Sequence, residues 1–217
     1  MRKRNIIISI FMILAVTVFY LGLPLSISFY RAIFDPMASL KIEKEFRKLS
    51  SDVLIRKLHP IHPFSATPLY AIEILAERQD TKAVPDLVKS INSWNPDRRY
   101  QAIRALGLIG DKRAVEPLLK IVNDGELKGK KYYRSALLSL CQIGYEPMRP
   151  VVLERLKRPD GARNGSAKMM EYIGKKDNIP LLEGMLSKIS GDDVNARLDR
   201  GSIKRAIEAI KKREGIQ

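Results

Sequence analysis

The chain has 217 residues, of which 29% are charged, 45% are hydrophobic and 7% are aromatic, a balance typical of a folded helical domain with a substantial core. The single cysteine, Cys141, excludes an internal disulfide and a multi-cysteine zinc site. The formal net charge of +15 favours acidic partners, which include acidic proteins, anionic lipid head groups and nucleic acid.

The N-terminal segment has the features of a membrane anchor. Residues 1–4 are basic (MRKR), and residues 5–30 contain no charged side chain. As a helix this run would be about 39 Å long, which exceeds the roughly 30 Å of a hydrocarbon core. Basic residues that flank a transmembrane helix usually stay on the cytoplasmic side of the membrane. We therefore expect a cytoplasmic N-terminus over 1–4 and a transmembrane helix over 5–30. The remainder of the chain would then lie on the exported side.

A cleaved signal peptide is the competing interpretation of the same segment. A signal h-region usually has about 7–15 residues and ends at a small-x-small cleavage site. The run here is longer, and its best candidate site, Ser26-Ile27-Ser28, matches poorly. The sequence therefore predicts a single-pass membrane protein, or a secreted or periplasmic protein if the segment is cleaved.

Residues 36–58 are predicted to form an amphipathic stalk helix. Ile42, Phe46, Leu49 and Val53 recur at steps of three and four residues, with charged residues between them. This periodicity is typical of a helix with one apolar stripe. We expect the stripe to contact the first element of the domain that follows.

Residues 59–66 are predicted to be a linker. They contain His59 and His62, which are the only two histidines in the chain. A spacing of three residues can suit a metal site, but the adjacent prolines prevent a regular helix and no third ligand follows. We therefore predict no metal site and no cofactor.

From Thr67 onward the sequence repeats itself at intervals of roughly 30 residues. Each unit has a helical stretch rich in small and branched residues, a turn, and a second helix with an apolar pair close after a proline. The apolar pairs are Leu87-Val88, Leu118-Leu119, Val152-Leu153 and Leu181-Leu182. Gly110, Gly144 and Gly174 follow three of the first helices, where glycine can adopt the left-handed conformation that ends a helix.

Residues 67–217 are therefore predicted to form an all-α, right-handed α-solenoid of about four helix pairs plus a terminal helix, because one pair cannot bury its apolar face alone. The fragment AIRALGLIGDKRAVEPLLKIVND, within residues 97–124, resembles the short HEAT-like repeats of the phycobilisome-lyase type. The similarity extends more weakly over 69–93, 133–159 and 164–189.

The resemblance implies a fold and a binding surface, since proteins built from such repeats serve many unrelated tasks. Iron-dependent hydroxylases built on similar repeats carry His-Glu ligand steps, and this sequence contains none. The sequence also lacks a Gly-rich phosphate loop followed by Lys and a serine nucleophile elbow. We expect a protein without enzymatic activity; a lyase-like enzyme or accessory subunit acting on a small ligand is the alternative.

Basic residues gather at the links between units, where the first helix of each unit begins. The predicted partner-binding surface consists of Arg98, Arg99, Lys128, Lys130, Lys131, Arg134, Arg163 and the tryptophan Trp94. Cations at a helix start oppose the helix dipole by up to about 1 kcal/mol each, so local helix stability does not explain them. A structural explanation of the arginines is a ladder of pairs with aspartates of neighbouring units, for which Asp97, Asp124, Asp160 and Asp193 are the candidates.

The leading prediction of function is a membrane-anchored interaction scaffold whose α-solenoid binds or positions another protein, with an acidic surface, at the cell envelope. A further alternative is a basic module that binds an anionic membrane surface or nucleic acid. The uncharged run over 5–30 argues against a nucleic-acid-binding protein.

Overall fold

The computed structural model describes residues 36–59, 67–125, 130–158 and 163–216. In these residues every regular element is a helix, and no strand is present. The chain divides into two compact units, Met1–Leu49 and Ser50–Gln217. The predicted all-α fold class is therefore confirmed for the part of the chain that the structure describes.

In the first unit the described helix is α3 (Pro36–Arg47). The predicted stalk helix over 36–58 is wrong, because α3 ends at Arg47 and a separate helix begins after Ser50, whose backbone is extended. Serine favours the position before a helix over a helix interior. Leu49 and Val53 keep the helical spacing across this break, so the apolar periodicity gave no sign of it.

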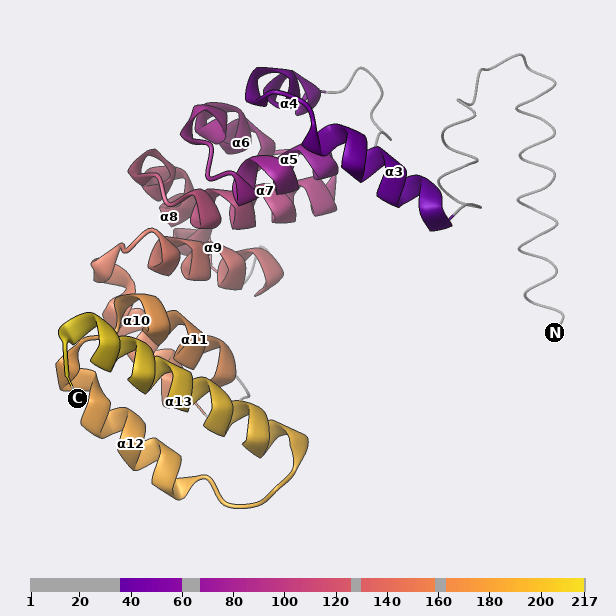
Figure 1. The fold of residues 1–217 in the computed structure, drawn as a ribbon. Helices are drawn as coiled ribbons and strands as arrows, with labels where there is room; N and C mark the ends of the chain where they lie inside the picture. The colour runs from indigo at the N-terminus through magenta and orange to yellow at the C-terminus, as the bar shows by residue number, and fades with distance from the viewer. Residues whose placement is uncertain (1–35, 60–66, 126–129, 159–162, 217) are drawn as a thin grey trace, which may run out of the picture. The chain divides into compact units, whose positions relative to one another are not determined.

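Short helices alternate with longer ones in the described residues of the second unit (Figure 1). The short helices are α4 (Ser51–Lys57), α6 (Val84–Ser90), α8 (Val115–Asn123), α10 (Arg149–Leu156) and α12 (Ile179–Lys188). The long helices are α5 (Thr67–Glu77), α7 (Pro96–Ile109), α9 (Lys130–Gln142), α11 (Arg163–Ile173) and α13 (Val194–Glu214). Four 3₁₀ turns, η1 (Thr81–Ala83), η2 (Lys112–Ala114), η4 (Glu146–Met148) and η5 (Lys176–Asn178), lead from a long helix into the next short one.

The helices pair in a different register from the predicted one. Each short helix packs on the long helix that follows it, starting with α4 on α5, and each long helix stacks on the next long helix. The sequence predicted long-then-short pairs beginning at residue 67. The structure instead starts the repeat domain at Ser50, because α4 buries Leu54 and Leu58 completely.

A small residue is buried in each of four long helices. Ala71, Ala102, Ala136 and Ala167 are fully buried, one in each of α5, α7, α9 and α11. Handedness of the stack stays a prediction.

The predicted glycine turns are confirmed at two of three positions. Gly110 and Gly144 follow long helices with φ of 76° and 81°, in the left-handed region. Gly174 also follows a long helix, but its φ is not positive. A Cβ at Gly174 would lie only 2.5 Å from the Ile210 side chain of α13, so this glycine is needed for close packing.

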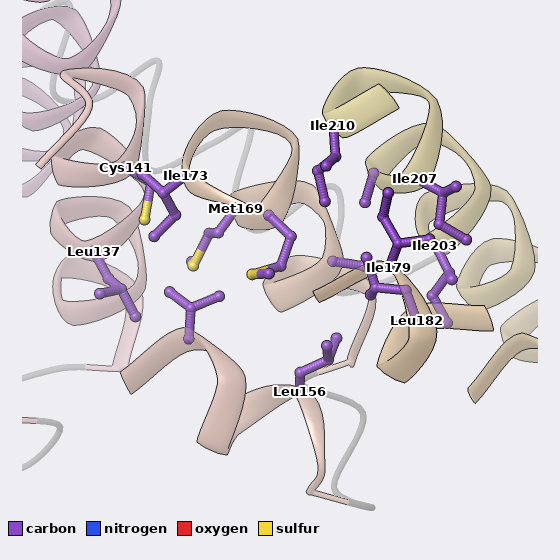
Figure 2. Packing of buried hydrophobic residues seen from close by; sticks show 14 residues of the cluster. Leu137, Cys141, Leu156, Met169, Ile173, Ile179, Leu182, Ile203, Ile207 and Ile210 are labelled. Carbon is purple, nitrogen blue, oxygen red and sulfur yellow. The ribbon is translucent and has the colours of Figure 1, made fainter. Parts of the chain in front are cut away.

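A continuous apolar cluster joins α9 to α13 (Figure 2). Leu137 and Cys141 of α9, Leu156 of α10, Ile173 of α11 and Ile203 of α13 are all 3% exposed or less. One element covers the next, so that no single helix pair closes the core alone. This arrangement is that of an α-solenoid.

Among the helices of the described residues, none combines the length and the apolar character needed to span a lipid bilayer. The longest, α13, has 21 residues, but charged side chains such as Arg197, Lys204 and Glu208 occur along it. The predicted membrane localisation, with an exported repeat domain, is contradicted by this finding. The predicted anchor, residues 5–30, lies outside the described residues.

The contact between α7 and α9 gives a test of this stacking. A Cβ on Gly107 would lie 2.6 Å from the Ser139 Cα of α9, so Gly107→Ala forces backbone to move. We expect a cost of about 1–3 kcal/mol from overpacking, which exceeds the gain of at most about 1 kcal/mol in helix propensity. The free energy of unfolding in urea should therefore fall.

The matched control is Gly184→Ala in α12, where an added Cβ meets no atom within 4 Å. This variant should gain about 0.5–1 kcal/mol of stability. A Gly107→Ala protein as stable as the unmodified chain would contradict close stacking at this point.

Candidate protein-binding surface

A hydrogen-bonded turn between α6 and α7 exposes the only tryptophan of the chain. Trp94 is 62% exposed. On one side of it, the Ser93 Oγ accepts a hydrogen bond from the Asn95 amide (3.2 Å), and the Ser93 carbonyl accepts two from the Arg99 guanidinium (3.1 and 2.8 Å). On the other side, Asn95 Oδ1 caps α7 by accepting from two amides of its first turn (2.9 and 3.0 Å). The indole therefore stands on a backbone fixed from both sides.

Arg99 also connects this turn to α9. Its guanidinium carbon lies 5.1 Å from the centre of the Tyr132 ring, a cation–π distance. A cleft of about 230 Å³ opens beside it, at the meeting of α6, α7, α8 and α9. Its lining consists of Ile91, Asn92, Arg99, Ile103, Ile121, Asp124, Gly125, Tyr132 and Tyr133. This volume falls below the roughly 300–1,000 Å³ of small-molecule sites and suits a side chain of a partner better.

Arg98, predicted as a partner-binding residue, points into the structure. Its guanidinium donates to the Leu58 carbonyl at the end of α4 and to Ser90 Oγ (3.4 Å). Burial lowers the pKa of the Arg98 guanidinium. The side chain ties α4 to α7, so its role in the fold is structural.

Arg163 forms the arginine–aspartate pair that the structural explanation required, but with a different acid. Its Nη1 lies 3.3 Å from Asp199 Oδ2, and both side chains are largely buried. Asp193, one of the predicted partners, instead caps α13 by accepting from two backbone amides (2.8 and 3.0 Å). Asp160 lies outside the described residues. Arg163 therefore joins α11 to α13 and does not lie beside Trp94.

The remaining predicted residues belong to α9 or to the segment before it. Arg134 is exposed on α9, and Lys130 and Lys131 form the first residues of this helix. Lys128 lies outside the described residues. Of the predicted set, the structure thus brings together Trp94 and Arg99. Sequence reasoning missed Tyr132, although the tyrosine pair directly after Lys130 and Lys131 was a usable signal.

The sequence predicted that His59 and His62 do not form a metal site. No group of three or more His, Cys, Asp and Glu side chains that could hold a metal ion occurs among the described residues. His59 Nε2 lies 3.0 Å from Asp86 Oδ1. Hydrogen bonds from Lys89 and from His59 lower the pKa of the Asp86 carboxyl. His62 lies outside the described residues.

Comparison with known proteins identifies the repeats. A family model described as HEAT repeats matches residues 51–129. A chain from the structure of the complex of CpcE and CpcF of phycocyanin lyase from Nostoc sp. PCC7120 is similar, with a TM-score of 0.55 and 22% identity over 74% of this chain; the alignment spans 66% of that chain. An engineered protein has a TM-score of 0.47 and 18% identity, over 82% of this chain and 92% of its own. No curated protein matches the sequence.

The stacked helix pairs define the class of protein as an α-solenoid. Within this class, residues 51–129 match the family model of HEAT repeats, and the fold is similar to that of the Nostoc chain. The predicted resemblance is confirmed at this level. The match begins at the first residue of α4, in agreement with a repeat domain that starts at Ser50.

The structural role of Arg98 can be measured. Arg98→Leu keeps an apolar stem but leaves the Leu58 carbonyl without its donor, so the free energy of unfolding should fall by about 1–3 kcal/mol. Arg104→Leu, on the exposed side of the same helix, is the matched control and should change it by at most about 0.5 kcal/mol. Equal urea midpoints for the two variants would contradict the inward role of Arg98.

Cys141 should be inert toward thiol reagents in the folded protein. Its side chain is fully buried, and burial raises the pKa of the thiol to about 12. At pH 8 only about one thiol in ten thousand would then be the reactive thiolate. A disulfide reagent at pH 8 should label Cys141 only after denaturant is added, where the ordinary pKa returns. Rapid labelling of the folded chain would contradict this burial.

Proposed function

We propose that this chain is a scaffold that binds another protein and has no enzymatic activity of its own. The observation that carries the proposal is the exposed Trp94 on its hydrogen-bonded turn. A turn that is already rigid loses little conformational freedom when a partner binds. Tryptophan is also among the residues that most often dominate the energy of protein interfaces.

The charge of the molecule supports an acidic surface on the partner. The chain carries a formal net charge of +15, and α9, which contacts the Trp94 turn through Arg99 and Tyr132, begins with two lysines. Complementary charge accelerates association and makes it sensitive to salt. Binding of the partner should therefore weaken as ionic strength rises.

The comparison with the Nostoc chain supports a protein partner as well. That chain was solved in a complex of two proteins, CpcE and CpcF. Because identity is only 22%, the likeness concerns the fold, and the proposal depends on Trp94. The alternative is an accessory subunit or lyase-like enzyme that acts on a small ligand; the cleft beside Arg99, of about 230 Å³, suits a side chain of a partner better than such a ligand.

Site-specific photo-crosslinking tests the proposal. A benzophenone amino acid replaces Trp94, or Glu183 on α12 as an exposed control position, in cells that naturally produce the chain. We expect one protein to be crosslinked at position 94 and not at 183. Equal crosslinking at both positions, or none at position 94, would contradict the proposed interface.

The crosslinked protein is then identified, purified and used in a binding assay. Trp94→Ala should weaken its affinity at least about tenfold, which corresponds to about 1.4 kcal/mol. Leu198→Ala removes another exposed apolar side chain (51% exposed) and should leave the affinity within about twofold. An unchanged affinity of the Trp94→Ala chain would show that the indole is not the anchor.

A further inference from the structure

The long helices share one burial pattern, in which a more exposed residue stands between two buried pairs. The central residues are Glu73 in α5, Arg104 in α7, Leu138 in α9 and Lys168 in α11. In α11, for example, Lys168 is exposed between the buried pairs Ser166–Ala167 and Met169–Met170. In α13 two consecutive residues, Lys204 and Arg205, occupy this position between buried pairs.

Helix geometry explains where the central residues point. Successive residues turn by about 100°, so the residues directly before and after the centre face the two neighbouring long helices. The residues two positions away face the short helices. Contact between α7 and α9 fits this geometry, since Ser139, directly after Leu138, donates to the carbonyl of Ile103, directly before Arg104 (2.8 Å). The central residues therefore form a line on the open side of the long-helix layer, which we name the ridge line.

Beyond α5 the ridge line has basic residues in α7, α11 and α13 and the apolar Leu138 in α9. Arg104 contacts the Gln101 amide oxygen (3.4 Å) and the Tyr100 ring (5.7 Å), neither of which is acidic. Lys168 has no ion-pair partner among the residues that the structure describes, whereas Arg163 at the start of the same helix is paired with Asp199. Arg104 and Lys168 thus keep their charge available to a ligand, whereas Arg205 of α13 is paired with Glu171 of α11 (3.4 Å).

Apolar side chains accompany these cations one helical turn further on. Leu108 follows Arg104 and is 45% exposed, and Tyr172 follows Lys168 and is 38% exposed. Between them, Leu138 on α9 is partly exposed. A surface that mixes isolated cations with exposed apolar groups suits an acidic segment that also carries apolar side chains.

We propose that the ridge line of α7, α9 and α11 binds an extended acidic segment of the partner protein, with acidic side chains over Arg104 and Lys168 and an apolar one over Leu138. Packed helices lie about 8–10 Å apart, and a segment in the extended polyproline II conformation advances about 3.1 Å per residue and points every third side chain to the same face. Every third residue of the segment therefore meets the next helix, and its two acids stand six residues apart. This inference rests on the proposed function, because it requires a protein partner, but it concerns a surface other than the Trp94 turn.

Two synthetic peptides of equal composition test the spacing. One has glutamates six residues apart with a leucine midway, and the other has the two glutamates adjacent. Fluorescence anisotropy with the full chain should show affinity about three- to tenfold higher for the spaced peptide at low salt, as expected for two weak surface pairs. Equal affinity for the two peptides, or no binding of either, would overturn the proposal.

Charge reversal tests the residues. The double variant Arg104→Glu, Lys168→Glu should bind the spaced peptide about tenfold more weakly. The double variant Arg56→Glu, Lys112→Glu makes the same change at exposed positions of α4 and η2 and should bind it as the unmodified chain does. Equal weakening by both would show that only net charge matters and would overturn the proposal. If the ridge variant unfolds, Arg104→Gln with Lys168→Gln replaces it.

The proposals for the Trp94 turn and for the ridge line can be contradicted independently. A partner that crosslinks at position 94 but binds the ridge variant with unchanged affinity would overturn the ridge inference and leave the proposed function standing. Specific binding of the spaced peptide together with no crosslinking at position 94 would overturn the Trp94 interface and leave the ridge inference standing.

Discussion

The close approach of one long helix to the next is the constraint on which the molecule depends. At the contact of α7 and α9, the Ser139 hydroxyl of one helix reaches the Ile103 carbonyl of the other (2.8 Å). Only glycine fits at position 107, opposite the Ser139 backbone. Because each repeat gains stability mainly from its neighbours, these small residues decide whether the array forms. The positions of a long helix that are not used for these or other packing contacts remain exposed to solvent and can bind a partner.

Arginines connect helices of different repeats in a second way, by donating hydrogen bonds to backbone carbonyls. Arg98 of α7 donates to the Leu58 carbonyl of α4, Arg113 of η2 donates to the Thr81 carbonyl of η1 (2.6 Å), and Arg213 of α13 donates to the Glu171 carbonyl of α11 (2.9 Å). A guanidinium has five donors in a fixed geometry, so it can donate to the carbonyls at a helix end. The aliphatic part of the same side chain can pack against apolar residues. Part of the positive charge therefore serves the fold, and a count of basic residues overstates the binding surface.

The sequence predicted what depends on local pattern and failed where packing decides. The repeats and the glycine turns at Gly110 and Gly144 follow from periodicity and residue type, whereas the exposure of Trp94 is known only from the structure. The helix break at Ser50 and the pairing of α4 with α5 do not, because apolar spacing continues through the break and either neighbour could have covered Leu54. Arg98 and Arg99 are adjacent in sequence, yet one points inward and the other holds the turn, which only the tertiary contacts distinguish.

Folding and binding are assigned to different positions of the same helix. In α7, Asn95 fixes the turn that carries Trp94, buried residues such as Ile103 face the neighbouring helices, and Arg104 faces solvent. Since the stacking contacts use the residues on both sides of the centre, the central side chain is not constrained by the core. Each repeat can then present a charged or an apolar group at this position, as the change from Arg104 to Leu138 to Lys168 along successive helices shows. A repeat fold of this kind separates the residues that build the array from those that select its partner.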